Sequence, residues 1–124
     1  MIKVTEIAFT CYPVKNMARA RAFYEGIIGL KPATVHDSEQ NSWTEYEIGG
    51  GAFSLGKMEG WLPSDNGASL AFEVEDFDAA ITTLRESGAK FKMEPFPTPV
   101  CQMAFLFDPE GNTVCIHKRN PGHH

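Results

Sequence analysis

The sequence predicts an α+β domain built from two tandem copies of one strand–helix–strand–strand–strand unit. The same order of predicted elements occurs twice along the 124 residues. Val14 and Asn16, at the start of the first predicted helix, correspond to Val74 and Asp76, each 60 positions later. Hydrophobic residues make up 43% and charged residues 22%, a balance typical of globular domains. Together these observations indicate duplication of one folding unit.

The first unit opens with a strand and a helix. Residues 4–14 are rich in β-branched and aromatic side chains, which predicts a strand. Asn16 can cap a helix through its side-chain oxygen. Apolar residues then recur at three- and four-residue spacing over 17–28, and Gly29 stands where a helix end is expected.

Three further strands complete the first unit. Residues 32–36 predict a short strand, and 43–48 and 52–55 predict a hairpin around the three glycines at 49–51. Gly, Pro, Ser, Asp and Asn gather in 58–67, which predicts the linker between the units.

The second unit repeats this plan. Residues 68–74 predict a strand, Asp76 a helix cap, and 77–84 a helix that ends at Gly88. A short strand is expected at 89–93.

The end of the second unit predicts a hairpin. Prolines at 95, 97 and 99 predict a loop, after which 100–107 and 112–118 predict strands. The turn at 108–111 has the Asp-Pro-x-Gly pattern of a type I turn. We therefore expect one domain over 1–120, with unit one at about 1–58, unit two at about 67–118, and a tail at 121–124.

The net charge and the cysteines indicate which partners and which cellular compartment to expect. A net charge of −5 with scattered Lys and Arg argues against nucleic acid. Cys11, Cys101 and Cys115 form no CxxC pair and predict free thiols in a reducing compartment. No apolar run reaches the roughly 20 residues that cross a membrane, and the N-terminus has no signal-peptide pattern, so we expect a cytoplasmic protein. The terminal histidines are left out of the site, because adjacent histidines bind metal ions unspecifically.

Two motifs and the repeat resemble the vicinal-oxygen-chelate superfamily, which includes glyoxalase I, bleomycin-resistance proteins and extradiol dioxygenases. The stretch from Val14 to Met17, followed by Phe23-Tyr24 and Gly29-Leu30, resembles its strand–helix signature. The segment 105–112, Phe-Leu-Phe-Asp-Pro-Glu-Gly-Asn, resembles its last hairpin, F-x-x-DPDGN. The resemblance extends to about Lys118. It implies a curved glyoxalase/bleomycin-resistance-type sheet around a cavity, with helices outside, and often a homodimer.

The resemblance also implies four metal-ligand positions, which this sequence does not keep. They fall on Phe9, on Ser54 (or on Leu55 if the register slips by one), on Ser69 and on Cys115. A catalytic metal with an open position typically needs about three protein ligands. We therefore expect no metal at this site and no glyoxalase I activity, with a divalent metal held by other residues as the alternative.

Strand alternation predicts which side chains line the cavity. If Phe9 and Ser69 point inward, so do Cys11, Ala71 and Glu73, which lie on the first strand of each unit. On the last strand of the second unit, Cys115 and His117 share the inward face. Trp43, Glu45 and Glu47 share a face of the 43–55 hairpin, whose orientation the pattern leaves open. The predicted ligand-binding set combines aromatic and aliphatic side chains with a few acids, a thiol and an imidazole. Its members are Phe9, Cys11, Trp43, Glu45, Ser54, Ser69, Ala71, Glu73, Cys115 and His117.

Each polar candidate has a functional and a structural interpretation. Cys115 beside His117 is either an activated thiolate or a buried structural cysteine. His117 is either a base or a surface histidine. Trp43 either stacks on a planar ligand or packs at a subunit interface, and Trp61 is either a lid or a dimer contact.

The leading functional hypothesis is a metal-free protein that binds or sequesters a small aromatic or cationic ligand. The alternative is a lyase, isomerase or dioxygenase that uses displaced ligands such as His36, Glu73, His117 or Cys115, or a cofactor-free His/Cys site. A protein-interaction module is the third possibility, although no charge run supports it.

Overall fold

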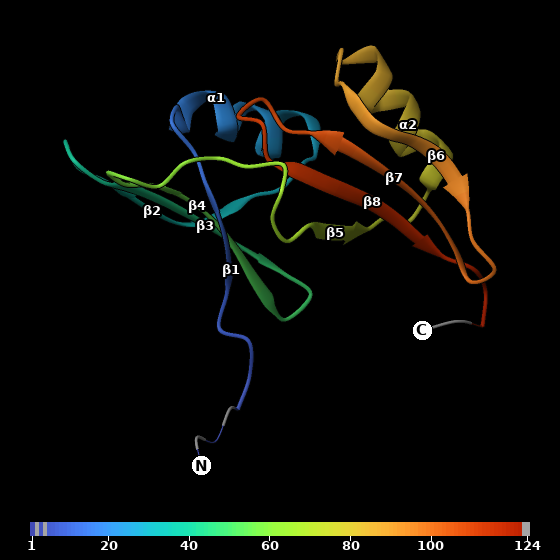
Figure 1. Ribbon diagram of the computed structural model, residues 1–124, viewed down its shortest axis with the longest axis horizontal. Helices are drawn as coiled ribbons and strands as arrows, with labels where there is room; N and C mark the ends of the chain where they lie inside the picture. Colours follow the sequence, from blue (N-terminus) through green and yellow to red (C-terminus); the bar gives the residue numbers. More distant parts are fainter. Residues whose placement is uncertain (2, 4, 123–124) are drawn as a thin grey trace. The chain divides into compact units, whose positions relative to one another are not determined.

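The computed structural model describes residues 1, 3 and 5–122. Parts of the predicted first strand and of the predicted tail fall on Val4, His123 and His124, which lie outside the described residues. The chain divides into two compact units, Met1–Leu62 and Pro63–His124, at a point inside the segment 58–67. Each unit holds one four-stranded sheet and one helical segment (Figure 1). Among the described helices, none has the length and apolar character needed to cross a membrane.

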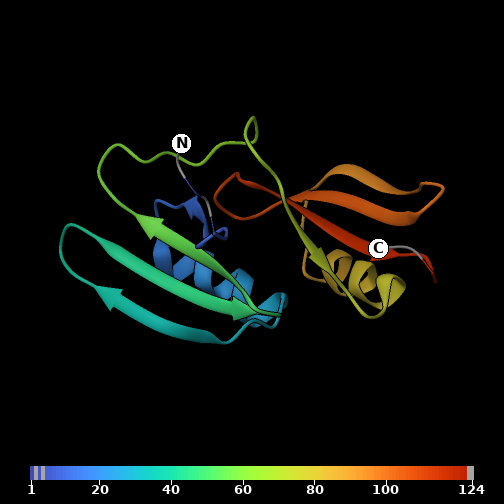
Figure 2. The same cartoon turned by 90° about the horizontal axis from the view of Figure 1, so that it is seen from below.

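Unit 1 has the predicted order of elements. Its elements are β1 (Thr10–Pro13), α1 (Met17–Arg21), η1 (Ala22–Ile27), β2 (Pro32–Asp37), β3 (Ser42–Ile48) and β4 (Gly51–Lys57). The strand order is β1-β4-β3-β2; β1 runs parallel to β4, and the other pairs are antiparallel. The helical segment lies against one face of the sheet (Figure 2).

The first helix begins as predicted but changes its winding. The Asn16 side chain accepts a hydrogen bond from the Arg19 backbone N–H at 3.0 Å, which confirms the cap. From Ala22 to Ile27 the turn widens to a π-helix, with the Ile28 N–H donating to the Phe23 carbonyl at 3.0 Å. A single α-helix over 17–28 was expected, and the extra residue per turn is a tertiary feature that helical periodicity does not reveal.

Unit 2 repeats the arrangement. Its elements are β5 (Leu70–Glu73), α2 (Phe77–Glu86), β6 (Phe91–Pro97), β7 (Cys101–Phe107) and β8 (Thr113–Arg119). The sheet order is β5-β8-β7-β6, with β5 parallel to β8. The Asp76 side chain accepts from the Ala79 N–H at 3.0 Å, so the second cap is confirmed 60 residues after the first.

Two predicted elements differ in extent. The first strand begins at Thr10, so Phe9 and the described residues before it lie outside any strand. The loop predicted at Pro95 and Pro97 is wrong, because β6 continues through Pro97. Strand β6 is an edge strand with two register shifts, and proline is tolerated at edges and bulges, where its missing N–H breaks no ladder bond.

Each unit buries a core between its sheet and its helical segment. In unit 1, Tyr24, Tyr46 and Phe53 pack together, with Tyr46 and Phe53 stacked at 5.9 Å between ring centroids. In unit 2, buried side chains of β7 and β8 such as Leu106 and Ile116 are accompanied by buried Leu84 of α2. The helical segment of each unit therefore covers one face of its sheet and does not cover the opposite face.

Candidate functional site

We call the sheet face turned away from the helical segment the open face. Cross-strand partners project from the same side of a sheet, so the register assigns its members. In unit 1 the open face contains two rows of cross-strand partners. One row is Cys11, Ser54 and Glu45, and the other is Pro13, Gly56, Trp43 and His36. Glu47 of β3, two residues after Glu45, projects from the same face. The hairpin that the sequence pattern left unoriented thus has Trp43, Glu45 and Glu47 on the open face.

Three aromatic side chains gather on the open face of unit 1, and we call Phe9, Trp43 and Trp61 with Gly56 the aromatic cluster. A methyl group placed on Gly56 would lie 3.2 Å from Trp61 Cζ3 and 3.3 Å from Trp43 Cε3. The ring of Phe9 meets Trp43 edge-to-face, with centroids 5.3 Å apart. Phe9 is 48% and Trp61 is 40% exposed, so the cluster offers aromatic surface to a ligand.

Trp61 reaches this cluster from the linker rather than from a strand. Its backbone N–H donates to the Met58 carbonyl at 3.1 Å, which closes a turn after β4. A cavity of about 340 Å³ lies beside it, bounded by Val14 and Lys15, by Gln40 and by the stretch from Lys57 to Leu62. Sequence reasoning placed Trp61 only in the linker, and no periodic signal could have assigned it to the open face.

Carboxylates flank the aromatic cluster. Trp43 Nε1 donates to Glu45 Oε1 at 3.3 Å, so the acid lies beside the indole. Glu47 and Glu6 line a further cavity of about 320 Å³ on unit 1. The faces of aromatic rings and the carboxylates both carry negative electrostatic potential, so both attract cations.

Cys11 and Ser54 form the inner part of the same face. The Cys11 Sγ lies 3.1 Å from the methyl position on Gly56. Burial raises the pKa of the Cys11 thiol, and its hydrogen bond with Ser54 opposes that shift only in part. Ser54 is fully buried, and its hydroxyl lies 3.5 Å from the Thr10 carbonyl. Both side chains are therefore uncharged near neutral pH and contribute no charge to the open face of unit 1.

The open face of unit 2 brings together most of the predicted second-unit residues. Ala71 is the cross-strand partner of Cys115, and Glu73 is the partner of His117. Ser69 precedes β5, and its hydroxyl lies 3.3 Å from that of Thr113.

Glu73 and His117 form a hydrogen-bonded pair. His117 Nδ1 lies 2.5 Å from Glu73 Oε1, and the Arg119 backbone N–H donates to Glu73 Oε2 at 2.9 Å. Burial opposes ionisation of Glu73, but these two donors outweigh it and hold the pKa of its carboxyl below the usual range. The sequence pattern placed both residues on one face without indicating that they touch.

Cys115 lies on the same strand face as His117, but the thiol is 3% exposed. Burial, supported by neighbouring Cys101, raises the pKa of Cys115 to about 11. A thiol with that pKa is protonated near neutral pH and is a weak nucleophile. This environment favours the structural interpretation of Cys115.

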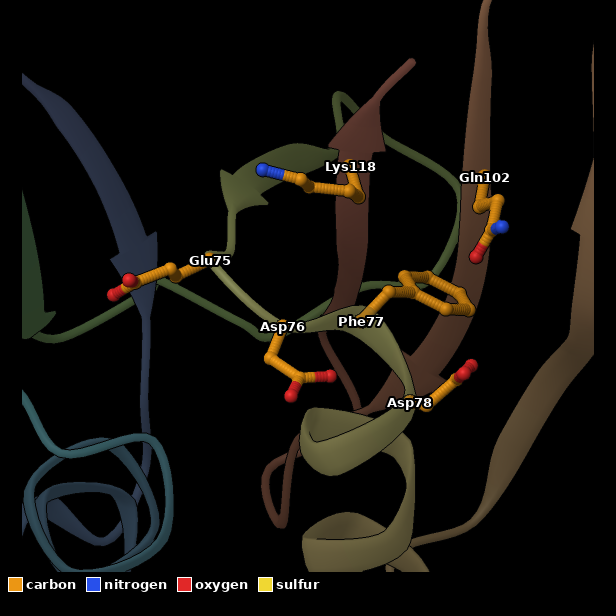
Figure 3. Close-up of a pocket in the computed structure, with 6 residues that line it drawn as sticks. All are labelled: Glu75, Asp76, Phe77, Asp78, Gln102 and Lys118. Carbon is orange, nitrogen blue, oxygen red and sulfur yellow. The ribbon is translucent and has the colours of Figure 1, made fainter. Parts of the chain in front are cut away.

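A cavity of about 630 Å³ lies on the other face of unit 2, at the start of α2 (Figure 3). Its lining consists of Glu75, Asp76, Phe77, Asp78, Gln102 and Lys118. Asp76 is already engaged as the helix cap. The sequence pattern predicted none of these residues as part of a binding site, because they come from a loop, a helix start and two strands.

The residues at the four implied metal positions do not fit a divalent ion. Phe9 has no donor atom, the hydroxyls of Ser54 and Ser69 are neutral, and the Cys115 thiol is held protonated. Within residues 1, 3 and 5–122, no group of three or more His, Cys, Asp or Glu side chains is placed to hold a metal ion.

The comparisons with known proteins agree on the fold. The model of the family described as Glyoxalase/Bleomycin resistance protein/Dioxygenase superfamily matches residues 6–116. A domain of this description from Frankia sp. EAN1pec is 19% identical, with a TM-score of 0.79, 98% of this chain and 97% of that chain covered. TnmS3, an antibiotic binding protein from Streptomyces sp. CB03234, is 22% identical, with a TM-score of 0.73 and coverages of 97% and 100%.

An enzyme is also among the similar structures. The trypanothione-dependent glyoxalase I of Leishmania major is 18% identical, with a TM-score of 0.76 and coverages of 93% and 87%. No curated protein matches the sequence. At these identities the similarity establishes the fold and leaves the chemistry to the residues themselves.

Proposed function

The chain belongs to the Glyoxalase/Bleomycin resistance protein/Dioxygenase superfamily, and we propose that within it the chain is a metal-independent binding protein for a small, planar, cationic aromatic molecule. The observation that carries the proposal is the aromatic cluster on the open face of unit 1, where Trp43 and Trp61 meet over Gly56 beside Glu45.

Stacking and charge give this surface its selectivity. Offset or edge-to-face contact between aromatic rings contributes about 0.5–1.5 kcal/mol per pair beyond buried area. A cation over an indole adds roughly 0.5–2 kcal/mol, depending on how far it is desolvated. Glu45 lies next to that indole, and Glu47 and Glu6 extend the negative charge. An anionic ring of equal size would meet repulsion instead.

The similar structures support a binding role without assigning one. TnmS3 is an antibiotic binding protein on the same fold. The residues at the implied metal positions do not fit a metal, which favours binding over the metal-dependent chemistry of other superfamily members. The raised pKa of Cys115 likewise makes a thiolate-based enzyme less favourable.

The test is a titration with proflavine, a planar aromatic cation, against anthracene-9-carboxylate, a planar aromatic anion of similar size. The chain has only two tryptophans, and both belong to the aromatic cluster, so intrinsic fluorescence reports on this surface. We expect saturable quenching by proflavine and a much weaker effect of the anion.

Two variants locate the binding. Glu45→Gln keeps the shape but removes the charge, and we expect roughly three- to tenfold weaker proflavine binding. Glu86→Gln, an exposed acid on α2, is the matched control and leaves the affinity unchanged. Equal binding of both dyes, or no binding of either, contradicts the proposal.

A further inference from the structure

The pair formed by Glu73 and His117 has a defined proton arrangement. Glu73 Oε2 accepts from the Arg119 backbone N–H at 2.9 Å, and its other oxygen lies 2.5 Å from His117 Nδ1. An ionised carboxylate only accepts hydrogen bonds, so the proton of the neutral imidazole resides on Nδ1. The lone pair is then on Nε2.

The Nε2 atom of His117 is available to a ligand. Within the described part of the chain, no hydrogen-bond partner is found for Nε2. Every buried side-chain nitrogen or oxygen in that part has a partner, so an unpartnered Nε2 must be reachable from solvent. The His117 side chain is 22% exposed, which agrees with a ring that is held by Glu73 and has Nε2 accessible to solvent.

The surroundings of the imidazole on the open face are apolar. Met103 of β7 is its cross-strand partner, and Phe105 faces Cys115 one step along. In the edge strand, Phe96 pairs with Met103 and the half-exposed Met93 pairs with Phe105. Thioethers and phenyl rings make favourable contacts with aromatic ligands. Arg119 adds a positive charge beside the pair, and its guanidinium lies 3.8 Å from Glu73.

We propose that the open face of unit 2 is a second small-molecule site, which binds phenols by accepting the hydrogen bond of their hydroxyl at His117 Nε2. Glu73 positions the imidazole and sets its tautomer, and the Met103 and Phe105 side chains contact the ring. A phenol combines a flat apolar body with one good donor, which matches one acceptor beside an apolar strip. The residues of this site all belong to unit 2 and those of the aromatic cluster all belong to unit 1, so the two proposals are tested with different variants.

The first part of the test needs no ligand. Long-range ¹H–¹⁵N NMR at pH 8 distinguishes the two neutral tautomers, with His117 identified by its absence in His117→Gln. We expect a protonated Nδ1 and a lone-pair Nε2 in the full chain. In Glu73→Gln the carboxylate is gone, and the Nδ1–H form loses its preference. A predominantly Nε2–H imidazole in the parent protein overturns the proposal.

The second part uses 4-cyanophenol and its methyl ether, 4-methoxybenzonitrile, which lacks the donor. By isothermal titration we expect the phenol to bind about tenfold more tightly than the ether. His117→Gln and Glu73→Gln should each remove this difference, and His36→Gln, on unit 1, should keep it. Circular dichroism checks the fold, and Glu73→Gln serves as the second variant if His117→Gln does not fold.

Equal affinity for phenol and ether in the parent, or an unchanged preference in both folded variants, overturns the site. Tryptophan emission separates this outcome from failure in unit 1, because both tryptophans belong to the aromatic cluster.

Discussion

Replacing Gly56 with alanine tests the aromatic cluster most directly. The added methyl group would lie 3.1–3.3 Å from Cys11, Trp43 and Trp61, whereas carbon atoms pack best at about 3.5–4.0 Å. Overpacking of this kind costs about 1–3 kcal/mol. Alanine in place of glycine within a strand recovers roughly 0.5–1 kcal/mol of backbone entropy. We therefore expect Gly56→Ala to lower the free energy of unfolding by about 1 kcal/mol.

Urea unfolding measures that change, and tryptophan emission reports its location. Trp61 lies outside the sheet and is already 40% exposed, so we expect the methyl group to displace this indole toward solvent and to shift its emission to longer wavelength. Trp61→Ala, alone and combined with Gly56→Ala, completes a double-mutant cycle. If the two indoles meet over Gly56, the methyl group costs less once Trp61 is removed. An unchanged emission spectrum together with undiminished stability would refute the reasoning.

Three further predictions concern the core, the thiols and assembly. Tyr46 is fully buried, and its hydroxyl donates to Glu25 at 2.8 Å, so Tyr46→Phe should cost about 2 kcal/mol in urea unfolding at pH 7. Hydrogen bonds from Arg21 and Tyr46, against the opposing effect of burial, hold the pKa of Glu25 below its usual value. The contribution of the Tyr46 hydrogen bond is therefore full above about pH 4.5 and is lost as the pH falls through the folded-state pKa. A cost of Tyr46→Phe that stays constant throughout an acid titration of the folded protein contradicts this prediction. With a pKa of about 11, Cys115 has roughly 0.1% thiolate at pH 8, so iodoacetamide should label it at least ~100-fold more slowly than in the urea-unfolded chain, as followed by peptide mass spectrometry. We also predict a homodimer, as the resemblance implies, and light scattering that gives a monomer at micromolar concentration would contradict this.

Local chemistry made much of the fold predictable. Asn16 and Asp76 cap their helices through a side-chain oxygen three residues away, which is a property of a few neighbouring residues. Gly88 has a φ of 80°, where glycine is strongly preferred, so its place at the helix end was also predictable. Strand alternation correctly placed Glu73 and His117 on one face, because the side-chain period of a strand does not depend on distant residues.

Tertiary structure decided the features that give the open faces their chemistry. Trp61 joins Trp43 only because a turn in the linker returns the chain over Gly56, and no sequence period encodes that return. Glu73 and His117 are 44 residues apart, and their contact depends on the parallel pairing of β5 and β8. The strand through Pro97 depends on its place at the sheet edge. Capping, turn and alternation rules act over a few residues and can be inferred from sequence, whereas cross-strand register and the return of a linker are set by packing of the whole unit.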